Sequence, residues 1–593
     1  MFPLLHILVT SVAIWVTWCL ASLINNLSQA RATGLKYVIL PCSLLGAPWL
    51  LSQSVFLPLL GALPHPWTVN WLPLLIFNDA WHNGYEPFER VGVDTFLAVS
   101  PGGIILYTCD ADVSSQLFRD GRFGKPAHLM QILNIFGPTM TGTDGAESRL
   151  YRRIAAPFFN EATLRQVFSH SVEGGRELQL VLRQDTAYRQ LRTLAARVSL
   201  HLLNRVCNQN QTSEDLVRAL RFKEKPTGTH RMTYTDAVHT LLNHYETVFL
   251  FPPGLLKLSP SHAHRKAAMA YIEMDQYMQE LVRREQVKPR PSSTEQKTLL
   301  DRLVEAALPF STESNGAILN KDQLFGNVWL FMFAGHEANA NTLTFIIILL
   351  ASHPNIQRAL QADIDSIIGD TPSDQWSYDL HYKHLMSGYV GAVINEALRL
   401  FTVLPVLPKY VAPSGPPIPI TVQGQSHPLP PGTVAFVNTS ATHRHPKYWP
   451  RKSESAKAAL GDPKKRPFGM SDFDPERWLN LNERESQIDS QNLDSFLNPY
   501  PGTFVPFSEG SRACLGYRFA LVELCAVVVS LFKESSVRLL TRNEEVRNGT
   551  SEEVADSWEA ARDRAELALS EGVKFDMSLR VTQSVPIKFE PRV

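Results

Sequence analysis

The chain has 593 residues, and its 57 basic and 57 acidic side chains give a formal net charge of zero. A neutral chain of ordinary apolar content offers no argument for a nucleic acid or an acidic polymer as partner. The six cysteines show no C-x-x-C pair and no zinc spacing, so we expect a reducing compartment and no disulfide framework.

The N-terminus is apolar. Residues 3–24 contain no Asp, Glu, Lys or Arg and are long enough to cross a bilayer as one helix. A cleavable signal peptide is the alternative, but it would need a charged start and a shorter apolar core. The first basic residues, Arg31 and Lys36, follow the span, so the positive-inside rule places the rest of the chain in the cytosol. We predict a single-pass membrane anchor in residues 1–30.

Three prolines interrupt a second apolar stretch, residues 37–63, and argue against a clean helix there. We expect residues 31–70 to be a lead-in that lies on the membrane surface, with Trp49, Trp67 and Trp71 near the interface. A two-span hairpin stays open as the alternative.

The body of the chain shows elements of both kinds. Residues 93–108 read as two short strands around a Pro-Gly-Gly turn. Residues 248–257 form an apolar loop, which predicts either an interface or a loop packed on the core. Residues 322–350 are a long apolar run without proline, and residues 352–369 have the cap, early proline and apolar face of a helix.

A glycine-rich loop with one cysteine, residues 507–516, runs directly into the apolar helix 517–532. A thiolate is favoured near a helix N-terminus, where free amides and the helix dipole stabilise negative charge. Gly510 and Gly516 let the backbone pass close to a flat ligand, and Arg512 offers a partner for a carboxylate of that ligand. The loop therefore predicts a metal ligand at Cys514, against the alternative of a buried structural cysteine.

This loop resembles the haem-binding signature of the cytochrome P-450 family, F-x-x-G-x-R-x-C-x-G. Phe507, Gly510, Arg512, Cys514 and Gly516 fill its fixed positions. The resemblance implies haem b with Cys514 as the proximal thiolate on iron. It also implies that Phe507 packs on the cysteine side of the haem and that Arg512 meets a propionate.

Two more basic positions follow from the resemblance. Residues 141–159 resemble the family helix that carries W-x-x-x-R, with Arg152 at the arginine position and Ser148 in place of the tryptophan. Arg152 is then a second propionate partner, and the tryptophan contact is lost. Residues 441–446 resemble a further landmark, in which His443 is our choice for a propionate contact.

The family's E-x-x-R motif is matched by Glu396 and Arg399, which share one helical face and can form a charge-assisted pair. By itself the spacing is common on surface helices. Its place between the long apolar run and the cysteine loop follows the family order, which implies a structural role that locks the proximal side to Arg477.

The long apolar run contains Ala334, Gly335 and Glu337, which resemble the family segment A-G-x-[DE]-T on the oxygen side of the haem. The acid and the alcohol of that segment deliver protons during dioxygen activation. Here the alcohol position is Ala338, whose side chain cannot hydrogen-bond. We expect close approach of the haem to explain Gly335, which costs about 1 kcal/mol inside a helix.

Three features can replace the missing alcohol. Thr342 lies one turn further along the same helical face. Asn339 or Asn341 can order a water molecule, and the substrate can bring its own polar group. Our hypothesis is ordered water with substrate assistance, with Glu337 as the acid.

The extended segment 401–408 would pass over the haem edge in the resembling fold. It makes Val403, Leu404 and Val406 candidate pocket walls, together with Phe333 and Ala334 of the long run.

The resemblance implies a mainly α cytochrome P-450-like fold with a small β region, in a catalytic domain at 71–593 that follows the membrane anchor. Two polar stretches, residues 451–472 and 542–571, read as solvated insertions, the second with helical character.

The function implied is a haem-thiolate monooxygenase of the endoplasmic reticulum membrane. It would oxidise a small lipophilic molecule, plausibly a secondary-metabolite intermediate, with dioxygen and electrons from NADPH through a partner reductase. Two alternatives stay open: a haem-thiolate enzyme that couples, dehydrates or rearranges its substrate without oxygen insertion, and a non-catalytic haem sensor or carrier.

Overall fold

The computed structural model describes residues 2–63, 68–76, 79–184, 187–208, 220, 226, 228–288, 297–307, 319–449, 473–479, 499–541 and 557–592. The predicted insertion 451–472, the first half of the second insertion and Trp67 lie outside these residues.

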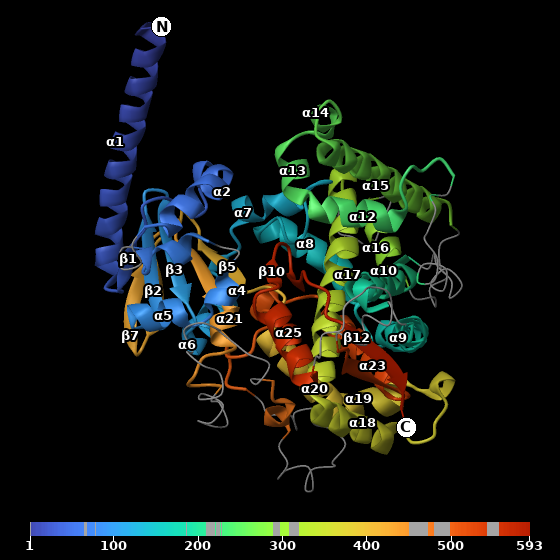
Figure 1. Ribbon diagram of the computed structural model, residues 1–593. Helices are drawn as coiled ribbons and strands as arrows, with labels where there is room; N and C mark the ends of the chain where they lie inside the picture. Colours follow the sequence, from blue (N-terminus) through green and yellow to red (C-terminus); the bar gives the residue numbers. More distant parts are fainter. Residues whose placement is uncertain are drawn as a thin grey trace.

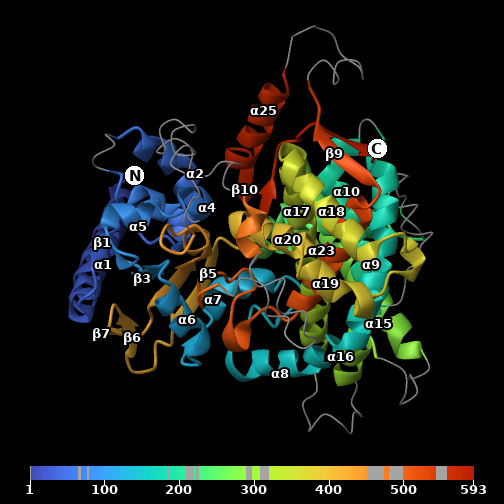
Figure 2. The ribbon, with the colours of Figure 1, turned by 90° about the horizontal axis from the view of Figure 1, so that it is seen from below.

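A six-stranded sheet forms one side of the molecule, and the long helices form the other (Figures 1 and 2). The strands run in the order β1-β2-β3-β8-β5-β4, with β1–β2 and β3–β8 parallel and the other pairs antiparallel. Their bounds are Tyr37–Ile39, Thr95–Ser100, Gly103–Thr108, Val434–Asn438, Val406–Val411 and Phe123–Gly124 in that order. The predicted hairpin at 93–108 is confirmed as β2–β3, paired from Thr95–Thr108 to Ser100–Gly103.

The helical side is built around α17 (Lys321–Ser352), which is buried along most of its length. Asn320 caps its first turn, with Gln323 completing a capping box. The helices packed on α17 include α10 (Leu191–Asn208), α15 (His262–Val287), α16 (Leu299–Ala307), α18 (Pro354–Ile368), α20 (Tyr389–Leu400) and α23 (Tyr517–Phe532), and α9 (Glu161–Leu182) packs on α10 and α23. This packing buries most of the large apolar side chains in one core.

Gly335 serves a packing role in α17. A Cβ at this position would lie 2.9 Å from Cδ1 of Leu203 on α10. The glycine therefore lets α10 approach α17 closely, which is a sufficient packing reason for it, and the approach of a haem stays a prediction.

The N-terminal helix α1 (Phe2–Thr33) projects from the body at its N-terminal end (Figure 1). Its C-terminal end is fixed to the β2–β3 hairpin, because Ser22 Oγ donates to Pro101 O at 2.6 Å and Asn26 Nδ2 donates to Ser100 O at 2.9 Å. The helix is long and apolar enough to cross a membrane over residues 10–33. The anchored part of the helix is thus continuous with a part that packs on the protein.

Residues 37–63 divide into two parts. Residues 37–39 are strand β1, where we expected membrane surface, and α2 (Ala47–Gly61) follows. Trp49 is buried and donates its indole N–H to Leu75 O at 3.0 Å, so it is a core residue and not an interface residue. Fifteen residues span about 22 Å, short of the ~30 Å apolar core of a bilayer, which argues against a second membrane span.

The apolar loop 248–257 forms two short helices, α13 (Tyr245–Leu250) and α14 (Pro253–Lys257). They lie on the same side of the molecule as the free end of α1 (Figure 1). Exposed apolar side chains gather on them: Phe249, Leu250, Phe251, Leu255 and, just beyond, Leu258. Of the two alternatives for this loop, the interface is the one that the exposure favours.

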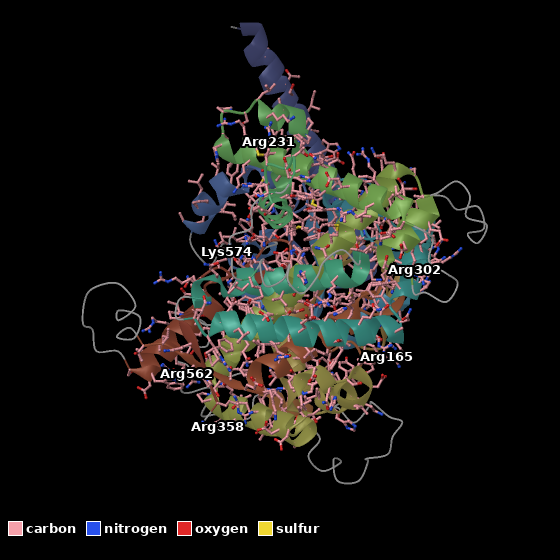
Figure 3. All side chains as sticks on the ribbon, turned by 90° about the vertical axis from the view of Figure 1, so that its right-hand side faces the viewer. Arg165, Arg231, Arg302, Arg358, Arg562 and Lys574 are labelled. Carbon is pink, nitrogen blue, oxygen red and sulfur yellow. The ribbon has the colours of Figure 1, made fainter. Side chains whose placement is uncertain are left out.

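The described part of the second polar segment contains α25 (Trp558–Ser570), which confirms its helical character. Ala561, Ala565 and Ala568 on one face of α25 are buried, so this part packs on the body and is not a solvated loop. Figure 3 shows the labelled basic residues of the helical side, among them Arg165, Arg358 and Arg562, at well-separated points.

Candidate active site

Cys514 lies on the loop between the 3-10 turn Gly510–Arg512 and α23. Its backbone N–H donates to Phe507 O at 2.8 Å, which closes the loop. The side chain is exposed to a cavity of about 240 Å³ that Arg152, Phe159 and Cys514 help to line. Burial raises the pKa of the Cys514 thiol, whereas the N–H of Gly516 and the charges of Arg152 and Lys125 act to lower it.

The two glycines of the loop differ in what they do. Gly510 has φ = +71°, and a Cβ there would lie 2.2 Å from Phe118 O, at the end of α6 (Ala111–Arg119). Only glycine fits this backbone position. Gly516 meets no such obstacle among the described residues, since a Cβ there would lie 3.5 Å from the Phe159 ring.

Arg512 is held by the segment that leads into α8 (Gly145–Ala155). Its guanidinium donates to Ser148 Oγ, to Met140 O at 3.1 Å and to Thr143 O at 2.9 Å. Ser148, which occupies the position of the expected tryptophan, thus binds the arginine of the cysteine loop. A contact between α8 and the loop is retained through a hydroxyl.

Arg152, also on α8, donates from Nη1 to Ala513 O at 2.8 Å. The guanidinium stands beside the thiol and favours its negative form. Arg152 therefore supports the cysteine loop directly, and its contact with a propionate stays a prediction.

Two lysines that the sequence analysis did not identify, the half-buried Lys125 and the buried Lys409, lie next to Arg512. Lys125 and Lys409 each have a pKa lowered to about 8, first by burial and then by the positive charge of Arg512. Asp144 is the acidic residue that offsets both. Lys125, Lys409 and Arg512 together carry more positive charge than Asp144 balances. A ligand with carboxylates would balance the rest. No short motif marks these lysines, because β5 and the segment after β4 bring them together.

The residues present fit a haem group. One thiol faces open space, and Ala334 is exposed on the otherwise buried helix α17, which packs against the α23 helix that follows the thiol. A flat apolar group between these helices would cover both residues. Its acidic edge would meet Arg512, Lys125 and Lys409.

The polar residues after Ala334 point in different directions. Thr342 Oγ1 donates to Ala338 O at 2.9 Å, so its proton is engaged within the helix. Asn339 Nδ2 donates to Glu523 of α23 at 2.6 Å, and Ser199 of α10 donates to the same carboxylate at 2.5 Å. Burial raises the pKa of Glu523 to about 7. Glu523 thus joins α23 to α17 and α10.

Glu337 and Asn341 lie on a third side, toward the hairpin of β10 (Val573–Phe575) and β11 (Leu579–Val581). Burial raises the pKa of Glu337, and Arg192 and Arg580 act to lower it. Asn341 Nδ2 donates to Ser578 Oγ in the hairpin turn at 2.8 Å. Ser578, like Lys125 and Lys409, is a residue that the sequence analysis missed.

Glu396 is the centre of a buried network. It accepts from Arg399 Nε at 2.8 Å and Nη2 at 2.7 Å, from Arg477 Nε at 3.0 Å, and from the indole N–H of Trp478 at 2.9 Å. Burial alone would raise the pKa of Glu396, but the two arginines and the Asp474 N–H hold it below its usual range. The expected partners Glu396, Arg399 and Arg477 therefore come together.

His443 takes part in the same network. Its Nε2 accepts from Val505 N at 2.8 Å, and its carbonyl accepts from Arg399 at 2.9 Å. Burial, followed by the Arg399 charge, lowers the pKa of His443 to about 3, so the ring is neutral. His443 is therefore part of the buried Glu396 network. The basic residues that lie near Arg512 are Lys125 and Lys409.

The candidate pocket residues separate into groups. Val403 packs on the main core, Leu404 is 38% exposed, and Ala334 is exposed on α17. Phe333 is buried and stacks on Trp329. Val406 differs from the expectation, because β5 turns its side chain into a separate core cluster with Phe436 beneath the sheet.

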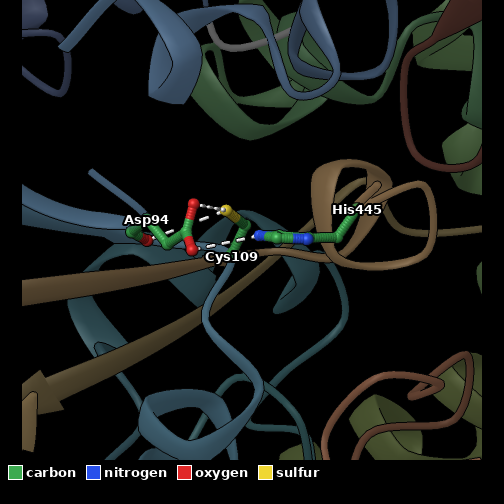
Figure 4. Close-up of side chains that lie close together, drawn as sticks. All are labelled: Asp94, Cys109 and His445. Carbon is green, nitrogen blue, oxygen red and sulfur yellow. Dashed lines mark hydrogen bonds and ion pairs between the residues drawn. The ribbon is translucent and has the colours of Figure 1, made fainter. Parts of the chain in front are cut away.

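Asp94, Cys109 and His445 lie together at the sheet (Figure 4). His445 Nε2 is 3.1 Å from Asp94 Oδ2, and Cys109 Sγ donates to Asp94 Oδ1 at 3.9 Å. The Lys447 N–H donates to His445 Nδ1, so Nε2 carries the ring proton. A metal ligand would need Nε2 free of its proton, and this cluster is accordingly a structural link.

Comparisons with known proteins agree with this geometry. The model of the cytochrome P-450 family matches residues 122–455 and 467–554. A cytochrome P-450 monooxygenase of Arthrobotrys oligospora is 25% identical over 99% of this chain and 98% of its own. The phomenoic acid biosynthesis cluster cytochrome P-450 monooxygenase of Leptosphaeria maculans is 26% identical over 86% and 88%. A crystal structure of the cytochrome P-450DA haem domain has a TM-score of 0.61 at 17% identity, covering 88% of this chain and 95% of that one.

Proposed function

The chain belongs to the cytochrome P-450 family and is a monooxygenase of that family, and on this premise we propose that it oxidises a small lipophilic intermediate of secondary metabolism. The observation that carries the proposal is the exposed Cys514 thiol on a closed loop, with the basic cluster of Arg512, Lys125 and Lys409 beside it. The fungal relatives support the metabolic context, since one of them is named for a phomenoic acid cluster.

Haem bound through Cys514 would supply the redox-active iron at which dioxygen is reduced. The protein's own part is to hold that group and to control protons near it. Arg152 and the N–H of Gly516 favour the thiolate of Cys514. Arg512, Lys125 and Lys409 would bind the propionates, and Glu337 would carry protons on the α17 side.

NADPH-derived electrons would arrive through a partner reductase. The free part of α1 and the exposed apolar residues of α13 and α14 support a membrane-bound enzyme whose lipophilic substrate arrives from the bilayer. Arg31, after the apolar stretch, supports a cytosolic catalytic domain on the endoplasmic reticulum.

The test is label incorporation from heavy dioxygen. The purified protein, a reductase and NADPH act on an extract of cells that lack this gene. We expect a new product that carries one labelled oxygen, and Cys514→Ser should abolish it. A consumed substrate whose product lacks the label would instead establish coupling or rearrangement, the alternative that Ala338 favours. A Cys42→Ser variant controls for the loss of a cysteine elsewhere.

A further inference from the structure

The β10–β11 hairpin brings a hydroxyl to the acid of α17. Phe575 pairs with Leu579, so residues 576–578 form a tight turn with Ser578 at its end. The Leu579 N–H donates to Val403 O at 3.0 Å, which fixes the turn beside the extended segment. Ser578 is only 5% exposed. Contacts with the rest of the protein therefore fix the position of the Ser578 side chain.

The hydrogen bonds give this hydroxyl a direction. Asn341 Nδ2 donates to Ser578 Oγ at 2.8 Å, so a lone pair of the oxygen is occupied and the hydroxyl proton is free to point away. Glu337 lies four residues before Asn341, on the same face of α17. The Ser578 side chain, which the Asn341 hydrogen bond places beside α17, is among the groups that act to lower the pKa of Glu337.

The charged groups around Glu337 come from two elements. Arg192 of α10 and Arg580 of β11 favour the carboxylate, and Asp576 of the turn opposes it. Arg580 is itself paired with Asp576 at 3.0 Å through Nε. Burial opposes the ionised form most strongly. The pKa of Glu337 is therefore raised by burial and held down by the two arginines, and a carboxyl with a raised pKa is suited to proton transfer.

Two buried acceptors of this cluster have no hydrogen-bond partner among the described residues: Glu337 Oε2 and Asn341 Oδ1. Buried acceptors of this kind are normally paired with protein or with ordered water. A water molecule at the two oxygens would satisfy both. The nearby hydroxyl of Thr342 is engaged with Ala338 O and does not compete.

We propose that Ser578 and Asn341 are positioning residues that hold the Glu337 carboxylate for proton transfer, in place of the alcohol that the chain lacks at Ala338. Protonated Glu337 would pass its proton to a water held by Asn341 Oδ1, while that water gives one of its own protons to the next acceptor. Glu337 would then be a carboxylate again and would be reprotonated from the side of Arg192 and Arg580. This inference rests on the proposed monooxygenase function, because it assigns the proton supply of that reaction.

The experiment compares Ser578→Ala and Ser578→Thr in the full-length haem-loaded enzyme. The first readout is the infrared carbonyl band of protonated Glu337, assigned with Glu337→Gln and followed against pH. Loss of the Ser578 hydroxyl should raise the pKa of Glu337, so the band should persist to a higher pH in Ser578→Ala than in the wild type. In Ser578→Thr, which keeps a hydroxyl, the band should disappear at the same pH as in the wild type. The second readout is the share of NADPH electrons that appears in product and not in hydrogen peroxide. This share should fall roughly tenfold, which is less than the ~10²–10⁴ that a positioned acid itself contributes.

Ser570→Ala is the matched control, since Ser570 is also buried and donates to Glu566 O within α25, away from Glu337. If Ser578→Ala does not retain haem, Asn341→Ala removes the donor that orients the hydroxyl and should shift the band in the same direction. An unchanged Glu337 titration in the folded variants would overturn the proposal. The infrared titration needs no substrate, so it stays decisive even if no labelled product is found and the proposed function fails.

Discussion

Arg477 Nε lies 3.0 Å from Glu396 Oε1, although 81 positions separate the two residues. Glu396→Gln would leave the buried charges of Arg399 and Arg477 without their counter-charge, so we expect a loss of about 3–5 kcal/mol in the free energy of unfolding. Denaturant titration measures it. The matched control is Asp379→Asn, which breaks the exposed pair with Arg165 and should cost less than about 1 kcal/mol. Equal losses in the two variants would contradict a central role for Glu396.

The same carboxylate makes stability depend on pH. The pKa of Glu396 is lower in the folded protein than its ordinary value of about 4.3. Its contribution is therefore present above that pH and is lost as the pH falls through the folded-state pKa. We expect the urea midpoint of the wild type to fall more steeply on acidification than that of Glu396→Gln. Parallel curves would show that Glu396 does not set this dependence.

Lys409 should contribute more to the affinity for haem than to the stability of the fold. Lys409→Gln removes one charge-assisted hydrogen bond to a propionate, worth about 1.5–3 kcal/mol, so haem should pass to an acceptor protein about ten- to a hundredfold faster. Lys409→Arg should retain most of the affinity. The control is Lys447→Gln, an exposed lysine that faces Tyr448. A release rate equal to that of the wild type would remove Lys409 from the haem site.

Gly335→Ala should destabilise the protein through Leu203. Crowding between the new Cβ and the leucine costs about 1–3 kcal/mol, which exceeds the ~1 kcal/mol that alanine gains in a helix. Leu203→Val should relieve part of this loss, and a double-mutant cycle of thermal or denaturant unfolding measures the coupling. Gly61→Ala in α2 meets no atom within 4 Å and serves as control. Additive effects of Gly335→Ala and Leu203→Val would refute the contact.

Membrane binding should have two components. Deletion of residues 2–20 removes the free part of α1, and we expect the shortened protein still to sediment partly with vesicles through α13 and α14. Leu255→Glu combined with Leu258→Glu should release the shortened protein, because both side chains are exposed. The same pair of changes in the full-length chain should leave it bound. A shortened protein that is wholly soluble before these changes would exclude α13 and α14.

Several expectations came from short patterns and were confirmed by the fold. The β2–β3 hairpin follows from one turn signal, and α17 follows from a long apolar run without proline. Local geometry suffices in these cases, because turn type and helix period involve residues close in the chain.

Other expectations were changed by contacts between distant segments. Trp49 was expected at a membrane interface and is buried against Leu75, and Val406 was expected in the pocket wall and packs under the sheet. The composition of a segment does not specify which neighbour covers it. Such assignments need the packed structure.

The sequence by itself determined the ligand loop, the order of the family landmarks and the apolar N-terminus, because each rests on residue identity at short spacing. Only the tertiary structure decided that Lys125 and Lys409 meet Arg512, that Leu203 packs against Gly335, and that Ser578 binds Asn341 of α17. These contacts join segments up to hundreds of positions apart. Packing, and not spacing along the chain, selects such partners.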